Sequence, residues 1–207
     1  DRYNTEMVFT EKDFENLFYM VNLETLFISD CGLTDISFVE KMPNLKKLSM
    51  PNNQISDLSP LAKLTKLESL VINTNQITDL SPLENLTNLT KLDVNGNQIS
   101  DITALAKMNQ MYSLDIGNNN ITNLTPLENM TKLKYLFMVS NDTLKDITPL
   151  SGLVNLSFLD IDSTEVTDLS RLYGLTNLQT IELNALYITE EEAEAFRKAL
   201  PDCVIEW

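Results

Sequence analysis

Histidine is absent from the 207 residues of this chain, and glycine and cysteine are scarce, with five and two copies. The absence of histidine removes the commonest general base, the usual activator of a nucleophile and a favoured metal ligand. None of the glycines forms a phosphate-binding loop, and the two cysteines do not have the spacing of a zinc site. Only carboxylate pairs remain as catalytic groups, so the sequence predicts a protein that is not an enzyme and carries no cofactor.

Positive charge is also scarce, because 15 Lys and Arg residues face 30 Asp and Glu residues, for a formal net charge of −15. A surface of this sign repels a phosphate backbone and an anionic membrane, so no nucleic acid partner is expected. A protein partner with a basic face is better matched. The alternative is that the acidic charge only keeps an elongated protein soluble.

Long apolar runs are missing as well. No stretch approaches the roughly 18 residues that a membrane-spanning helix needs, so direct membrane insertion is not expected. The first residues, DRYNTEMVFTEKD, are polar and acidic, unlike a signal peptide, and position 1 is not Met. We therefore expect a piece of a longer protein, in which address signals and anchors lie outside this chain.

What the sequence has in abundance is a repeat. Apolar residues recur at the first, fourth and sixth places of a 22-residue unit, and only the sixth unit has 23 residues. This alternation has the period of a β-strand, and strands that recur at a constant interval stack as a parallel sheet. The units begin at Leu23, Leu45, Leu67, Leu89, Met111, Leu133, Leu156, Leu178 and Leu200.

Two further features of the unit indicate how the chain turns after each strand. The ninth place is Asn in units two to six, as in Asn75 and Asn97, and its amide can bond the backbone of the turn. A Ser-Pro or Thr-Pro pair follows, as in Ser59-Pro60, and we interpret the hydroxyl as the cap of a short helical turn. The sixth unit has one extra residue at Asn141–Leu144, which is expected to bulge just after the strand, beside Val139.

This pattern resembles the leucine-rich repeat family, and the phrase N-Q-I-x-D-L-S-P-L is most similar to bacterial internalin-type repeats. The resemblance implies an α/β solenoid with a curved parallel β-sheet on the concave side and short helical turns on the convex side. We expect one continuous domain, with an N-terminal helical cap at 1–22, seven leucine-rich repeats at 23–177, and a final repeat with a C-terminal cap at 178–207.

The two ends of the chain support helical caps. Thr10 precedes acidic residues and a helical spacing of apolar ones, and Thr189-x-x-Glu192 is a capping box that opens a second helix. Cys31 and Cys203 belong to the first and ninth strands, about 38 Å apart at the usual strand spacing. A disulfide needs Cα atoms within about 7 Å, so the two cysteines cannot pair within one chain.

The third, fifth and seventh places of each unit face outward from the open side of the sheet. Most are small or polar, but large apolar residues gather in units five to seven. Such residues, surrounded by acids, are typical of a protein-binding face. The alternative is that the aromatic rings only stack across strands and stabilise the sheet. The candidate partner-binding residues are Tyr112, Tyr135, Phe137, Val139 and Phe158, with Asp93, Asp115, Asp160, Asp162 and Glu182 around them.

A cation site among these acids is disfavoured. Asp160 and Asp162 share a face but are about 7 Å apart along the strand, whereas calcium needs six to eight oxygens within about 2.6 Å. No metal site is therefore predicted.

The resulting prediction is a monomeric protein–protein interaction module that binds a partner on its concave face. An extracellular or bacterial cell-surface location follows from the internalin resemblance alone. Two alternatives stay open. The chain is a structural spacer without a ligand of its own, or it is an intracellular regulatory subunit of the leucine-rich repeat type.

Overall fold

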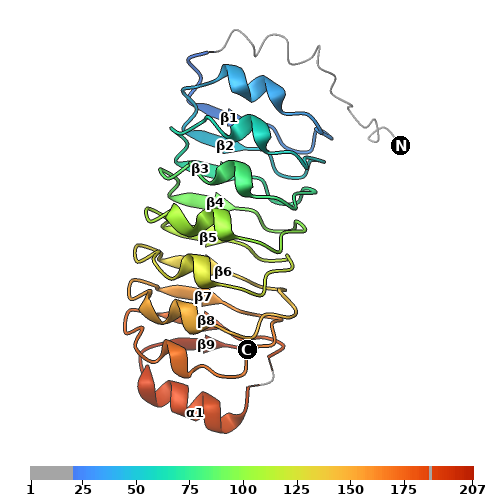
Figure 1. Ribbon diagram of the computed structural model, residues 1–207. Coiled ribbons are helices and arrows are strands. Elements are labelled where there is room, and N and C mark those ends of the chain that lie inside the picture. Colours follow the sequence, from blue (N-terminus) through green and yellow to red (C-terminus); the bar gives the residue numbers. More distant parts are fainter. Residues whose placement is uncertain (1–20, 187) are drawn as a thin grey trace, which may run out of the picture.

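The computed structural model describes residues 21–186 and 188–207. Within these residues, nine short parallel strands lie in chain order in one sheet, and each is hydrogen-bonded to its neighbours in the chain order (Figure 1). The partner residues of adjacent strands are one unit apart, as in Leu48, Leu70 and Leu92. The strands are β1 (Thr25–Phe27), β2 (Lys47–Ser49), β3 (Ser69–Val71), β4 (Lys91–Asp93), β5 (Ser113–Asp115), β6 (Tyr135–Phe137), β7 (Phe158–Asp160), β8 (Thr180–Glu182) and β9 (Val204–Glu206).

Short 3-10 helices form the layer opposite the sheet, one between each pair of consecutive strands up to β8. Figure 1 shows them stacked along the same axis as the strands. They are η2 (Ser37–Lys41), η3 (Ser59–Leu61), η4 (Ser81–Leu83), η5 (Thr103–Lys107), η6 (Thr125–Leu127), η7 (Thr148–Gly152) and η8 (Ser170–Leu172). The α-helix α1 (Glu190–Ala199) takes this place between β8 and β9. The predicted α/β solenoid is confirmed.

The core lies between the two layers and runs without a break along the stack. The predicted inward places are fully buried, as Leu67, Leu70 and Ile72 show for the third unit. Burial of this kind stabilises by about 25 cal/mol per Å² of apolar surface removed from water. Because each unit covers the apolar face of the next, no unit has a closed core of its own.

The ninth-place asparagines of units two to six form a hydrogen-bonded ladder beside this core. Asn75 donates through Nδ2 to the carbonyl oxygens of Met50 (3.0 Å), Ile72 (3.0 Å) and Asn73 (3.2 Å). Its Oδ1 accepts from the backbone N–H of Ile55 in the preceding unit, at 3.0 Å. The amide thus satisfies backbone groups of the turn that have no sheet partner, as predicted.

The cap of each 3-10 helix differs from the prediction. The hydroxyl of Ser59 does not cap η3, because Ser59 is the first residue of that helix. Its backbone N–H donates to Asp57 Oδ1 at 2.8 Å, and Pro60 follows within the first turn. The Asp of the Asp-Leu-Ser-Pro phrase is therefore the capping residue, since its short side chain reaches the amide two residues on. The same bond recurs at Asp35, Asp79, Asp101, Asn123, Asp146 and Asp168.

The predicted C-terminal helix is present, but among the described residues only the Thr189 half of the predicted capping box forms. Thr189 accepts from the N–H of Glu192, and three acids occupy the first turn of α1. Glu192 Oε1 also accepts from the Leu169 N–H at 2.8 Å and from the Tyr173 hydroxyl at 3.3 Å, which joins α1 to the preceding unit. The predicted N-terminal helix at residues 10–20 lies outside the described residues. Cys31 and Cys203 are free and belong to opposite ends of the stack.

Candidate functional site

The open face of β5–β7 brings the predicted aromatic residues into contact. The ring centroids of Phe137 and Phe158 are 4.9 Å apart with the rings tilted by 37°. Tyr112 and Tyr135 meet edge to face, with centroids 5.4 Å apart. We call these four residues the aromatic cluster. Tyr135, Phe137 and Phe158 are half-buried, whereas Tyr112 is 47% exposed at the edge of the cluster.

Val139 lies beside the cluster because a glycine in the neighbouring unit leaves room for it. A Cβ atom at Gly117 would come within 2.8 Å of Val139 Cγ1 and within 2.7 Å of Asn95 Nδ2. The half-buried Val139 therefore packs against the backbone of the preceding unit. Gly117 is a neighbour of the candidate site that the sequence analysis did not single out, although it holds the outward-facing seventh place of its unit.

The five predicted acids lie on the same face, and hydrogen bonds hold four of them. We call Asp93, Asp115, Asp160, Asp162 and Glu182 the acidic ring. Asp93, Asp115 and Asp160 each accept from the backbone N–H two residues later, at 2.9–3.1 Å. Side-chain amides add bonds between units: Asn95 donates to Asp115, and Asn184 donates to Asp162. Several of the carboxylates thus have fixed positions beside the aromatic cluster.

Burial changes the acidity of part of the ring. Asp160 is only 7% exposed, and this burial raises its pKa to about 6, helped by the charges of Asp162, Glu182 and Asp115. Burial also raises the pKa of Asp93 and of Glu182. The physical cause is that the charged form of a carboxyl loses hydration when the group is covered.

The side chains of three acids come closer together than the strand spacing predicts. Ligand atoms of Asp160, Asp162 and Glu182 all lie within 4.8 Å of one another. The expectation that 7 Å along the strand keeps the first two apart is therefore wrong for their oxygens. Asp160 and Asp162 already accept the hydrogen bonds named above, which are sufficient to explain their positions.

Other exposed features were not anticipated. Phe27 on β1 is 70% exposed on the same face, and its fifth-place position could have identified it. Val204 and Trp207, at the last strand, are 56% and 55% exposed. Along the side of the sheet, two solvent-open hollows are lined by residues that directly precede the strands, and one of them includes Tyr112. Within the described residues, no helix has the length and apolar character that crossing a bilayer requires.

Comparison with known proteins identifies the repeat. The model of leucine-rich repeats, in two copies, matches residues 21–63, 43–85, 65–107 and 113–152. No curated protein sequence matches the chain with significance.

Similar solved structures agree with this match. An internalin (inlF) from Listeria monocytogenes is 38% identical, with a TM-score of 0.81, over 93% of this chain and 55% of that one. An internalin C2 from the same species is 32% identical, with a TM-score of 0.79, over 95% of this chain and 84% of that one. The ectodomain of the Arabidopsis thaliana receptor kinase GASSHO1/SCHENGEN3, solved with CASPARIAN STRIP INTEGRITY FACTOR 2, is 22% identical (TM-score 0.74, 83% and 22% coverage) and shows the fold alone. The chain thus spans about half the length of the first of these structures.

Proposed function

We propose that this chain, which belongs to the leucine-rich repeat family and is of the internalin-like type, binds a protein partner on the open face of β4–β8. The observation that carries the proposal is the aromatic cluster, which gathers four rings in contact on a face where the other outward residues, apart from the single Phe27, are mostly small or polar. Aromatic residues supply large contact areas at low entropic cost, and they are over-represented among residues that dominate binding energy.

The geometry of the cluster suits a binding anchor. The rings of Phe137 and Phe158 hold each other at 4.9 Å, so little side-chain freedom is lost when a partner covers them. Cross-strand stacking alone would also account for the contact, at about 0.2–1 kcal/mol per pair. Stacking alone gives no reason for the large rings to lie next to five acids, whereas a face that binds a partner with basic residues does.

The acidic ring indicates the chemistry of the partner. Aromatic anchors would take apolar side chains, while the surrounding carboxylates would attract Lys and Arg residues of the same partner. The net charge of −15 acts in the same direction at longer range. The proposed partner is therefore a protein segment with apolar side chains between basic ones.

The proposed setting is a bacterial cell surface or a secreted protein. Support comes from the likeness to two Listeria internalins, at 38% and 32% identity. The plant receptor ectodomain solved with its factor is consistent with binding by this fold. We further propose that the chain acts as a monomer and catalyses no reaction.

A displayed library of random peptides, selected on the immobilised chain, tests the proposal. Enriched peptides should combine aromatic or aliphatic residues with Lys or Arg. Phe137→Ala should weaken their binding by about 2 kcal/mol or more, which is roughly thirtyfold. The matched control is Val71→Ala, on the same face three strands away, which should bind as the wild type does.

Two results would contradict the proposal. Binding that survives the triple change of Tyr135, Phe137 and Phe158 to Ala would show that the cluster only packs the sheet, and the chain would then be a spacer. Enriched peptides whose binding is sensitive to residues of the 3-10 helices would place the interface on the other side. Melting temperatures of the variants separate loss of binding from loss of fold.

A further inference from the structure

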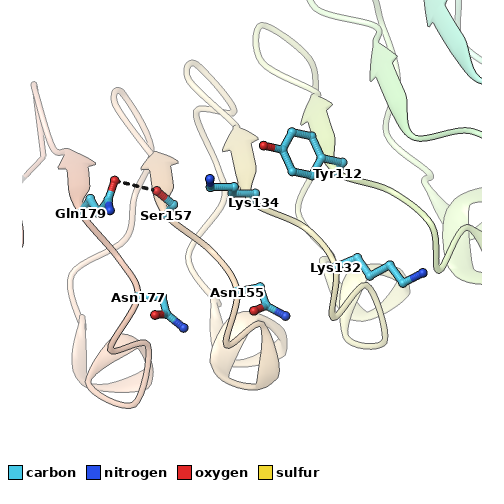
Figure 2. A pocket seen from close by; sticks show the side chains of 7 residues that line it. All are labelled: Tyr112, Lys132, Lys134, Asn155, Ser157, Asn177 and Gln179. Carbon is cyan, nitrogen blue, oxygen red and sulfur yellow. Dashed lines mark hydrogen bonds between the residues drawn. The ribbon is translucent and has the colours of Figure 1, made fainter.

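A second surface differs from the rest of the molecule; it borders the open face and shares Tyr112 with the aromatic cluster. It is a hollow of about 480 Å³ at the side of the sheet, between the residues that enter β5–β8 and the turns that precede them. Figure 2 shows two rows of side chains around it, one at the strands and one at the turns. The lining residues are Tyr112, Lys132, Lys134, Asn155, Ser157, Asn177 and Gln179.

The amides of the hollow have fixed orientations. Asn155 Nδ2 donates to the carbonyl oxygen of Thr131 at 2.7 Å, and Asn177 Nδ2 donates to that of Val154 at 2.8 Å. Ser157, which is buried, donates through Oγ to Gln179 Oε1 at 3.1 Å (Figure 2). These bonds use one end of each amide. The Oδ1 atoms of both asparagines and Nε2 of Gln179 have no hydrogen-bond partner among the described residues.

The hollow is also positively charged in a strongly acidic chain. Its lining includes two lysines and no carboxylate. Lys134 Nζ lies 5.5 Å from the centroid of the Tyr135 ring and forms no ion pair within the described part of the chain. Lys132 Nζ donates to Gln110 Oε1 at 2.5 Å. Lys134 is therefore a cation that is held in place without being neutralised.

A second hollow lies at the same side of the sheet, at β2–β5, and allows a comparison. We call it the upper hollow, and we call the hollow at β5–β8 the lower hollow. The upper hollow is of similar size, about 450 Å³, but it has no aromatic residue and includes the carboxylate of Glu68. Its lysines are both engaged, since Lys46 pairs with Glu24 at 2.9 Å and Lys66 donates to Asn44 at 2.6 Å. Asn88 of this hollow donates to the carbonyl oxygen of Thr65 at 2.8 Å, so the repeat itself produces the oriented asparagines. It does not produce the ring of Tyr112 or the lining without a carboxylate, which distinguish the lower hollow.

We propose that the lower hollow binds a short acidic oligosaccharide. Sugar hydroxyls both donate and accept, and oriented amides offer acceptors (Asn155, Asn177) and a donor (Gln179) at fixed positions. The exposed ring of Tyr112 provides an apolar face for a sugar ring, with its hydroxyl as a further partner. Lys134 would pair with the carboxylate of a uronic acid, since charge-assisted hydrogen bonds are the stronger ones.

The shape and the charge of the molecule narrow the ligand further. The hollow is open to solvent and extends across several units, which suits a row of sugar rings better than one compact apolar ligand. A long polyanion would meet the repulsion of the net charge of −15. A short chain that presents only a few carboxylates to Lys134 and Lys132 avoids most of that cost.

Titration calorimetry with hyaluronan hexasaccharide, which alternates uronic acid and N-acetylated sugar, tests the inference against neutral maltohexaose. The acidic hexasaccharide should bind, and Lys134→Gln should weaken it by about tenfold, the scale of one charged hydrogen bond. Gln179→Ala and Tyr112→Ala should also weaken binding. Lys66→Gln in the upper hollow is the matched control and should leave it unchanged.

Each other outcome overturns the inference. Absence of binding by both sugars at about 5 mM, a concentration that detects even weak sites, would exclude a carbohydrate site of useful affinity. Equal binding of maltohexaose would refute the acidic ligand, and insensitivity to Lys134→Gln and Gln179→Ala would place the sugar elsewhere. Phe137 does not line the hollow, so Phe137→Ala, which tests the open face, should leave sugar binding intact. This variant therefore distinguishes the two proposals, although both sites include Tyr112.

Discussion

The backbone N–H of Leu144 donates to the carbonyl oxygen of Asn141, three residues earlier, at 2.9 Å. In the four preceding units, the equivalent amide donates instead to the ladder asparagine of the next unit, as Ile121 does to Asn141 Oδ1. The next unit has Thr164 at that place, and its shorter side chain bonds Ile161 O and lies near Val166 N. The extra residue of the sixth unit thus forms a local turn that satisfies the buried Leu144 amide.

The first prediction follows from this compensation. Deletion of Thr143 restores the 22-residue spacing but removes the local acceptor, so it should lower the free energy of unfolding by about 1–3 kcal/mol. Adding Thr164→Asn to the deletion should recover most of the loss, because the ladder then continues. Urea unfolding of the two variants measures both effects. A deletion that is neutral on its own would contradict the compensation.

A second prediction concerns the regular part of the ladder. Asn75→Ala leaves the buried Ile55 N–H and the bonded carbonyls unpaired, and should cost at least about 1–3 kcal/mol of stability. The control is Thr87→Ala, an exposed change in the same repeat that should stay within about 0.5 kcal/mol. Equal melting temperatures for the two variants would refute the role of the amide.

The sequence predicts those parts of the fold that depend only on the residues that every repeat unit shares with the next unit. Leu70 and Leu92 are in register because the 22-residue interval leaves no other pairing, and Asn75 bonds the turn of its own and the preceding unit. The extra residue was also expected after the strand of the sixth unit. It lies two or more residues beyond Val139, in the turn, because Leu144 must return to the core.

The sequence does not predict properties that depend on how the side chains of adjacent repeat units differ from one another. Asp160 is only 7% exposed and has Phe137 and Glu182 as its neighbours in register, and its place in the repeat unit alone does not reveal this burial. The charge of the lower hollow depends on which lysines lack carboxylate neighbours. Lys46 and Lys134 both hold the second place of their repeat units, but Lys46 pairs with Glu24 whereas Lys134 lies beside the ring of Tyr135. The capping role of Asp57 was missed because the adjacent Ser-Pro pair also fits a helix start.

A third prediction concerns the glycine beside the open face. Gly117→Ala should cost about 1–3 kcal/mol, since the new methyl group meets Val139 Cγ1 and Asn95 Nδ2 at less than the closest normal contact. Gly174→Ala is the control, because nothing lies within 4 Å of a Cβ atom there. Thermal unfolding of the two variants compares them. If Val139 is trimmed at the same time (Val139→Ala), part of the loss at Gly117 should be recovered, as expected for a pairwise clash.

The last prediction concerns pH. Because the pKa of Asp160 in the folded chain is raised from 3.8 to about 6, the folded state binds more protons than the unfolded state between these values. The contribution of Asp160 to stability is therefore complete below about pH 4 and is lost as the pH rises through about 6. Asp93 and Glu182, whose pKa values burial also raises, act in the same direction. The carboxyls with lowered pKa oppose this effect only below their ordinary values of 3.8 and 4.5; they are Asp57, Glu84, Asp101, Asp146 and Asp168.

The melting temperature should accordingly rise when the pH is lowered from 7 to 5. Asp160→Asn should remove much of this slope, because the amide retains an acceptor for the Asp162 N–H and does not titrate. Asp57→Asn is the control and should keep the slope, since that carboxyl titrates in a more acidic range. The same protonation neutralises part of the acidic ring, so basic peptides selected on the open face should bind more weakly at pH 5 than at pH 7. Binding that is unchanged over this range, or a slope that survives Asp160→Asn, would show that the raised pKa of Asp160 governs neither property.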